Sequence, residues 1–186
     1  MPCYTVDTMS QLVFTTTLYT IGDRTILYVP EEESKKLPSR GQIMAKGTIN
    51  GHDFRDAFEP DGAWSHWLDV TPELQERLGV AAGDSVTVVM ESTKEWPEPR
   101  VPADWQSAID ADPQVHALWD RVTPMARWEW LRWINATSVA ETRAKRIEVS
   151  CSKLLNGLRR PCCFNRNMCC VPDVSKNGVL LQRGSA

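Results

Sequence analysis

The chain has 186 residues, of which 42% are hydrophobic and 24% charged, and its net charge at pH 7 is −3. This length and composition are typical of a soluble globular protein that buries a core without disulfide bonds. No stretch approaches the ~18 consecutive apolar residues of a membrane span, which excludes an integral membrane helix. The first residues show no basic segment followed by an apolar one, so we expect no secretory signal and a cytoplasmic location.

The charge is unevenly distributed along the chain. Residues 143–166 carry seven Lys and Arg side chains against one Glu, so the residues before them are strongly acidic in sum. Such a basic end could bind nucleic acid or an acidic partner. Because it has few aromatic residues and no nucleic-acid-binding motif, we expect it to fold back onto the acidic body instead, and we do not expect nucleic acid as a partner.

The first half of the sequence predicts β-strands. Residues 12–30 are rich in β-branched and aromatic side chains and are interrupted by a Gly22-Asp23 turn. Asn50-Gly51 joins two further apolar runs, which is typical of a hairpin with a type I′ turn. Residues 64–69 alternate as a half-buried strand would. About six short strands at regular spacing predict a small closed or partly open β-barrel at residues 10–93.

The second half predicts helices. Residues 94–102 contain three prolines and few apolar side chains, which is typical of a linker. Asp112 and Thr123 each precede a proline, so each places an N-capping side chain before a favoured first helical residue. The stretch Ser138-Val139-Ala140-Glu141 has the Ser-x-x-Glu spacing of a capping box. We therefore expect about four short helices in a small domain at residues 103–158.

Residues 159–186 form a cysteine-rich tail. Phe164, Met168 and Val171 make it too apolar for a disordered end, so we expect it to pack on the body, with a strand pair turned at Asn177-Gly178. The predicted fold class is therefore α+β, with an N-terminal small β-barrel, a small α-helical domain and an ordered Cys-rich tail.

The stretch RWEWLRWINATSVAETRAKRIE, residues 127–148, resembles the helical domain of the YdeI/OmpD-associated, bacteriocin-protection family. The shared pattern is an Arg-x-Glu-aromatic opening, then Trp-Ile, then Glu-Thr-Arg-x-x-Arg-Ile. The N-terminal half, from GTINGHDF to GVAAGDSVTV, resembles the small β-barrel domain of unknown function that often precedes it. The resemblance covers roughly residues 10–160 and implies a fold and a domain order but no reaction. Thr137 and Ser138 stand where the family has Ala-Lys, so any binding role of that lysine is absent here.

Several side chains are candidate ligand contacts, and we expect the ligand in the crevice between barrel and helices, where pockets tend to form. Tryptophans offer stacking surfaces, and a Glu near two Arg offers acid/base chemistry or an anchor for a ligand. The structural alternative is that the tryptophans fill cores, while the Glu caps a helix and the Arg side chains form ion pairs. The candidates are Trp64, Trp130, Trp133, Glu141, Arg143 and Arg146. A further acidic group, Asp53, Asp56, Glu59 and Asp61, is expected in a solvated loop.

Four of the six cysteines form two adjacent pairs in the tail, and three interpretations compete. Thiolates bind Zn(II) or Cu(I), although the usual Cys-x-x-Cys spacing is absent here. A redox or regulatory disulfide is the second interpretation, because Arg159, Arg160 and Arg166 would lower the thiol pKa. The third is ordinary packing of small buried thiols. The cysteines concerned are Cys151, Cys162, Cys163, Cys169 and Cys170.

These features favour a non-enzymatic, cytoplasmic binding or stress-protection protein that holds a small molecule or a peptide. The alternative is a thiol-based metal-binding or redox-responsive protein that uses the tail cysteines. An enzyme has less support, because the three histidines lie far apart in the sequence and no Gly-x-Ser-x-Gly motif or phosphate-binding glycine loop is present. The sequence leaves the oligomeric state open.

Overall fold

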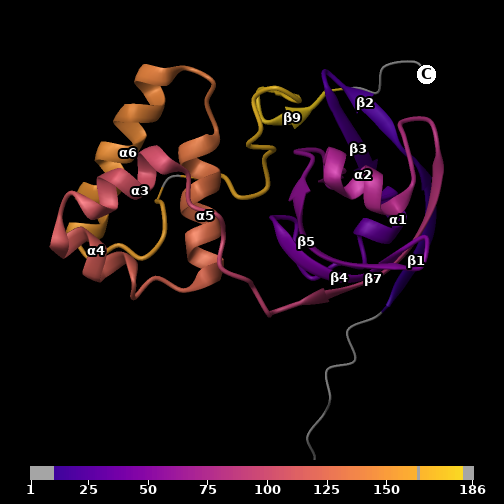
Figure 1. The fold of residues 1–186 in the computed structure, drawn as a ribbon, viewed down its shortest axis with the longest axis horizontal. Coiled ribbons are helices and arrows are strands. Elements are labelled where there is room, and N and C mark those ends of the chain that lie inside the picture. The colour runs from indigo at the N-terminus through magenta and orange to yellow at the C-terminus, as the bar shows by residue number, and fades with distance from the viewer. Residues whose placement is uncertain (1–10, 163, 182–186) are drawn as a thin grey trace, which may run out of the picture.

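A computed structural model of the chain describes residues 11–162 and 164–181. The fold is α+β, with a curled sheet beside a group of helices (Figure 1). The C-terminal segment, yellow in Figure 1, runs from the helices to the sheet, where β9 lies near β2. Among the described helices, none combines the length and the apolar composition that crossing a bilayer requires.

Seven antiparallel strands form a curled half-barrel in the order β1-β7-β4-β5-β6-β3-β2. β1 and β2 stand at opposite ends of this sheet, yet only Leu18 separates them in the chain. The sheet therefore curls back toward its own first strand without full closure. The strands are β1 (Leu12–Thr17), β2 (Tyr19–Ile21), β3 (Arg24–Tyr28), β4 (Ile43–Ile49), β5 (His52–Pro60), β6 (His66–Asp69) and β7 (Ser85–Thr93).

The turns follow the local sequence signals. Asn50 and Gly51 join β4 to β5 with φ values of 49° and 82°, as a type I′ turn requires. Two short helices, α1 (Glu31–Ser34) and α2 (Pro72–Leu78), accompany the sheet. Thr71 caps α2 by accepting a hydrogen bond from the Leu74 amide, and Gly79 ends the helix in the left-handed conformation.

The strand expected at residues 64–69 is shorter than predicted, and its alternation is wrong. Trp64 lies before β6 in a turn with φ of 82°, and His66, Trp67 and Leu68 are all buried. Leu68 belongs to the core inside the half-barrel, whereas Trp67 packs on the outer face with Cys169. Because the C-terminal segment covers the outer face, β6 has no solvent-facing side and needs no polar alternation.

The acidic group expected in a solvated loop is placed differently. Asp53, Asp56 and Glu59 lie within β5. Asp61 is buried just after the strand, where its carboxylate accepts hydrogen bonds from the Ala63 and Ser65 amides and from the Tyr28 hydroxyl. The strand after Asn50-Gly51 is longer than its few apolar residues indicate, because backbone hydrogen bonds to β4 stabilise it through its polar positions.

The helical part contains α3 (Ala103–Asp110), α4 (Pro113–Trp119), α5 (Pro124–Asn135) and α6 (Ala140–Leu155). Asp112 and Thr123 cap α4 and α5 as predicted, with a proline following each cap. The predicted capping box is wrong, because Val139 occupies the N-cap of α6 and no side chain caps that helix. A core separate from that of the sheet forms here around Trp105, Trp130 and Ile134.

The described part of the C-terminal segment touches both halves. Its short hairpin of β8 (Ser175–Lys176) and β9 (Val179–Leu180) lies against the half-barrel, where the Leu180 amide donates to the Asp61 carbonyl. Gly62 and Gly178 meet so closely that a Cβ on Gly62 would lie 2.0 Å from the Gly178 carbonyl oxygen. Earlier in the segment, the Met168 carbonyl accepts a hydrogen bond from Arg132 on α5.

Candidate functional site

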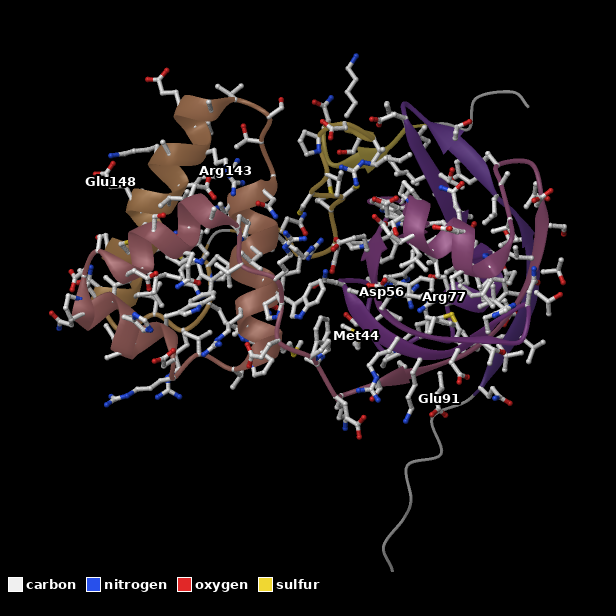
Figure 2. The ribbon with its side chains drawn as sticks, in the orientation of Figure 1. Met44, Asp56, Arg77, Glu91, Arg143 and Glu148 are labelled. Carbon is white, nitrogen blue, oxygen red and sulfur yellow. The ribbon has the colours of Figure 1, made fainter. Side chains whose placement is uncertain are left out.

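The junction of half-barrel and helices encloses a cavity of about 270 Å³. Its walls come from the loop before β4, the linker, α5 and the C-terminal segment. An apolar groove of about 790 Å³ adjoins it, and the two share Ser39, Gln42, Trp96 and Met125. We call the smaller space the inner cavity, the larger one the groove, and the two together the crevice. Met44, in the groove, lies on the side of the half-barrel toward α5 (Figure 2).

Arg132 joins the three parts of the molecule that meet at the crevice. Its side chain, only 5% exposed, forms a 2.7 Å ion pair with Glu59 of β5. The same guanidinium donates to the Met168 carbonyl, and it stacks over the Phe164 ring at 5.3 Å. Because the guanidinium is buried and also donates to a backbone carbonyl, the ion pair fixes the positions of α5, β5 and the C-terminal segment relative to one another.

Gln42 lines the inner cavity and is held in place by Glu59. Its Nε2 donates to Glu59, which fixes the orientation of the amide, since a flipped amide would set two oxygens against each other. Its Oε1 is buried and finds no hydrogen-bond partner among the described residues. Less than 1 Å² of this oxygen is exposed, so it lies within the packing of the cavity wall rather than on its surface.

Glu129, on α5, also lines the inner cavity. The residue is 6% exposed, and its Oε2 finds no hydrogen-bond partner among the described residues. Charge compensation is present, because Arg160 and Arg166 lie 3.5 and 3.2 Å from its two oxygens. Two cations therefore hold this carboxylate at the wall of the inner cavity.

A buried histidine holds the loop that carries Gln42. His66 Nε2 donates to the Gly41 carbonyl at 2.8 Å, so its Nδ1 must accept from the Ser34 hydroxyl, also at 2.8 Å. Burial lowers the pKa of His66 from 6.5 to about 4, which keeps the ring neutral at pH 7. The pair has the composition of a nucleophile and its base, but both residues are fully buried, so it positions the loop.

The linker forms a fixed wall of the crevice. Trp96 packs edge-on against Trp128 of α5, with ring centroids 6.0 Å apart. The Trp128 indole donates to the Pro97 carbonyl, and Glu98 pairs with Arg127. Residues expected as a plain linker therefore dock on the first turns of α5 and hold Trp96 at the boundary between groove and inner cavity.

A larger hollow of about 940 Å³ lies on the half-barrel itself, between β5, α2 and β7. Asp56, Arg77 and Glu91 line it, and all three lie on the sheet side of the molecule in Figure 2. Burial raises the pKa of Asp56, and the hydrogen bond from the Ala57 amide and, to a smaller extent, Arg77 oppose that shift. The described residues that line this hollow include none of the buried polar atoms that lack a partner.

The sequence-predicted contacts fall into separate places. Trp133, Glu141 and Arg146 line one hollow of about 410 Å³ on the helical part. Arg146 donates to the Trp133 carbonyl and lies 5.8 Å from the centre of its ring. Trp130 is buried in the helical core, and its indole donates to the Arg159 carbonyl. The structure brings these side chains to the helical part, away from the crevice.

The remaining two predicted contacts also lie outside the crevice. Arg143 holds Asp104 through two hydrogen bonds of 2.6 and 2.9 Å, which ties α6 to α3 (Figure 2). It also donates to Asn135. Trp64 is 71% exposed in the turn before β6, and its carbonyl accepts a hydrogen bond from Arg40.

The described cysteines lie in different parts of the structure. Cys151 packs against the helical core, Cys169 lies in the cluster on the outer face of the sheet, and Cys162 is exposed. Cys163 lies outside the described residues. In the described ranges, no group of three or more Cys, His, Asp or Glu side chains could hold a metal ion.

The thiols of Cys151, Cys169 and Cys170 are less acidic than a free cysteine, whereas the sequence predicts more acidic thiols. Burial raises the pKa of Cys170 to about 11, and the neighbouring Arg132 only partly opposes this shift. Burial also raises the pKa of Cys151 and of Cys169. The expected activation by arginines of the tail is wrong for these three thiols, because the cost of burying a thiolate outweighs the attraction of the cations.

Sequence reasoning missed the residues that shape the inner cavity, which are Gln42, Glu59, Glu129, Arg132 and Arg166. One signal was present on α5. Glu129 and Arg132 are three residues apart and therefore share a face, next to the stripe of Trp130 and Ile134. A helix that has one apolar stripe and, beside it, two oppositely charged side chains is typical of an element that packs on two different neighbours.

Comparison with known families agrees with this architecture. Residues 98–157 match the family model described as Bacteriocin-protection, YdeI or OmpD-Associated. Residues 14–90, which span most of the half-barrel, match the model described as Domain of unknown function (DUF1905). No curated protein matches the chain. The chain therefore carries a DUF1905 domain, followed by a helical region that matches the YdeI/OmpD-associated, bacteriocin-protection family.

Proposed function

We propose that this protein is a non-enzymatic, cytoplasmic binding protein of the bacteriocin-protection type, and that its ligand lies in the crevice. The observation that carries the proposal is the position of the crevice, because an apolar groove and an inner cavity adjoin where the half-barrel, the linker, α5 and the C-terminal segment meet.

The walls of the crevice favour a ligand that binds without large rearrangement. Arg132 ties α5 to β5, His66 fixes the loop at Gly41, and Trp96 is held against Trp128. A preformed site loses little conformational entropy on binding, which is what a binding protein needs. The proposal also includes a division of the chain into a sheet domain at residues 10–93, a helical domain at 103–158 and an ordered tail from residue 159. Arg166 and Asn167 of this tail line the inner cavity.

A blocked variant tests this proposal. Met125 lines both the groove and the inner cavity, so Met125→Trp should fill the crevice. Leu155→Trp, at an exposed position near the end of α6, is the matched control. In a ligand-observed NMR screen of small molecules, we expect compounds that bind the wild type and Leu155→Trp but bind Met125→Trp at least tenfold more weakly. Equal binding to all three proteins, or no binding compound at all, would contradict the proposal.

The same variants test the link to protection. Cells that produce the wild type or Leu155→Trp should survive a bacteriocin challenge better than cells that produce Met125→Trp at equal protein levels. If the blocked variant protects as well as the wild type, protection does not pass through the crevice.

A further inference from the structure

The crevice is surrounded by more cations than carboxylates. Among the described residues that line it, Glu129 is the only carboxylate, and Arg160 and Arg166 already pair with it. When the ion-pair partners behind the walls are included, positive charge is still in excess. The cations are Lys36, Lys94, Arg132, Arg160 and Arg166, and the carboxylates are Glu33, Glu59 and Glu129. Because the chain as a whole carries −3, this local excess marks a place that attracts anions.

Two of these cations are accessible to a ligand. Arg166 lines the inner cavity, and its side chain is 47% exposed. Its Nε lies 3.2 Å from Glu129, but its guanidinium donates no hydrogen bond to any of the described residues, so N–H groups remain for an acceptor. Lys94 lines the groove, is exposed, and forms no ion pair within the described part of the chain. Both side chains therefore offer donors that solvent already reaches.

The first turn of α5 gives the same sign to the boundary between the two spaces. Pro124 and Met125 begin this helix, and Met125 lines both the groove and the inner cavity. The N-terminal end of a helix carries a partial positive charge, because its first amide groups have no carbonyl to donate to within the helix. The backbone thus adds to the attraction that the side chains exert on an anion.

The groove determines what accompanies an anionic group. Its walls include the apolar side chains of Leu37, Ile43, Met44, Trp96 and Met125. Its volume of about 790 Å³ lies within the range of small-molecule pockets. An apolar chain that leaves water for this groove should gain roughly fourfold in affinity for each methylene group that it buries.

The larger hollow on the half-barrel lacks this combination. Phe54 and Leu74 are the only large apolar side chains among the described residues that line it. Its charged side chains are Asp53, Asp56, Glu73, Glu91, Lys46, Arg55 and Arg77. Carboxylates outnumber cations there, so an anion would be repelled. The crevice, in contrast, places accessible cations beside an apolar wall.

We infer that the crevice binds organic anions that carry one carboxylate on an apolar chain, with the carboxylate beside Arg166 in the inner cavity and the chain in the groove. This inference rests on the proposed function, because it names the ligand class of the same site. A guanidinium donates paired hydrogen bonds to a carboxylate. A phosphate dianion would bring a second negative charge to a wall that already holds Glu129, so the monovalent head fits better.

A matched series of compounds tests the inference. Octanoate is the probe, and octanamide, octylammonium and octyl phosphate replace its carboxylate by a neutral, a cationic and a dianionic head. Butanoate keeps the head and shortens the chain. Binding is followed by ¹H–¹⁵N NMR on the indole of Trp96, which lines both spaces. We expect octanoate to shift this signal, the three other heads to bind at least tenfold more weakly, and butanoate at least fiftyfold more weakly.

Variants locate the head. Arg166→Gln should weaken octanoate at least tenfold and change the affinity for octanamide less than twofold, because only the carboxylate uses the guanidinium. Arg121→Gln, at an exposed position after α4, is the matched control and should leave both affinities unchanged. Lys94→Gln, also at an exposed position, should weaken octanoate about threefold through the loss of a nearby charge.

Comparison of the two ligands keeps this test independent of folding. A variant that has lost its structure loses octanoate and octanamide together, whereas loss of the head contact affects octanoate alone. An equal loss of both ligands in Arg166→Gln, or no loss of octanoate, would overturn the placement of the head at Arg166. Unchanged octanoate binding in Lys94→Gln would contradict the part that this cation plays.

The outcomes also separate the inference from the proposed function. If octanamide, octylammonium or octyl phosphate binds the crevice as tightly as octanoate, the inference is wrong and the binding function stands. If octanoate does not bind while other compounds from the screen are lost in Met125→Trp, the inference is again wrong alone. If no compound binds the crevice, both are wrong.

Discussion

The crevice and the hollow around the family motif on the helical part differ in how their polar groups are used. Around the motif, Arg143 donates hydrogen bonds to Asp104, and Arg146 donates to the Trp133 carbonyl. These two arginines therefore hold helices together. At the crevice, Arg132 pairs with Glu59, and Arg160 and Arg166 pair with Glu129, so ionic groups join the half-barrel, α5 and the C-terminal segment around a cavity. The difference teaches that the polar groups of a recognisable motif can hold one part of a fold together, while those at the crevice join separate parts around a cavity, where we propose that a ligand binds.

The largest effect should come from Arg132, at the centre of the crevice. Arg132→Met leaves Glu59 buried without its cation, which should lower the free energy of unfolding by about 3–5 kcal/mol. Arg143→Met, on the motif side, should cost about 1 kcal/mol or less, because its ion pair with Asp104 is partly exposed. Urea unfolding measures both. Adding Glu59→Gln to Arg132→Met should recover part of the loss, and equal losses for the two single variants would remove the contrast between the regions.

The next effect is pH dependence on the crevice side. Between pH 6.5 and about 4 the unfolded chain protonates His66 whereas the folded protein does not, so protons favour unfolding. The stability contributed above pH 6.5 is lost as the pH falls, by roughly 3 kcal/mol in full. The measurement compares the unfolding free energy of the wild type and of His66→Gln across this range. A variant with the same pH slope as the wild type would show that His66 is not the group responsible.

A smaller effect is expected for the ion pair that closes the motif side. A double-mutant cycle with Asp104→Ala and Arg143→Ala should give a coupling energy of about 1 kcal/mol or less, since both partners remain partly exposed. Raising the salt concentration to about 1 M should reduce the coupling further. A coupling well above 2 kcal/mol at either salt concentration would mean that this side is as tightly built as the crevice.

The smallest effect concerns Trp64, which belongs to neither region. Its φ of 82° is unfavourable for a bulky side chain, and the side chain is mostly exposed. Trp64→Gly should therefore be more stable than Trp64→Ala by about 1 kcal/mol, because only glycine adopts this conformation without strain. Thermal unfolding of the two variants decides the matter, and an alanine variant that equals the glycine one would show that the turn relaxes.

Local signals allowed much of the fold to be predicted. The starts of α2, α4 and α5 and the turn between β4 and β5 depend on residues adjacent in sequence, so their chemistry is visible there. The site could not be found in the same way. Glu59 and Arg132 are 73 residues apart, and nothing near either one indicates the other. The burial of β6 on both faces could not be predicted for a related reason, because a segment distant in the sequence covers its outer face.

The contact between Gly62 and Gly178 has a consequence for reading other sequences. With φ of 79°, position 62 alone would admit Asn or Asp as well as glycine, but the Gly178 carbonyl leaves no room for any Cβ. Position 62 thus carries information about a segment more than a hundred residues downstream. Among relatives that share this half-barrel, a side chain at this turn should mark proteins in which no C-terminal hairpin crosses the sheet, and glycine should persist wherever one does.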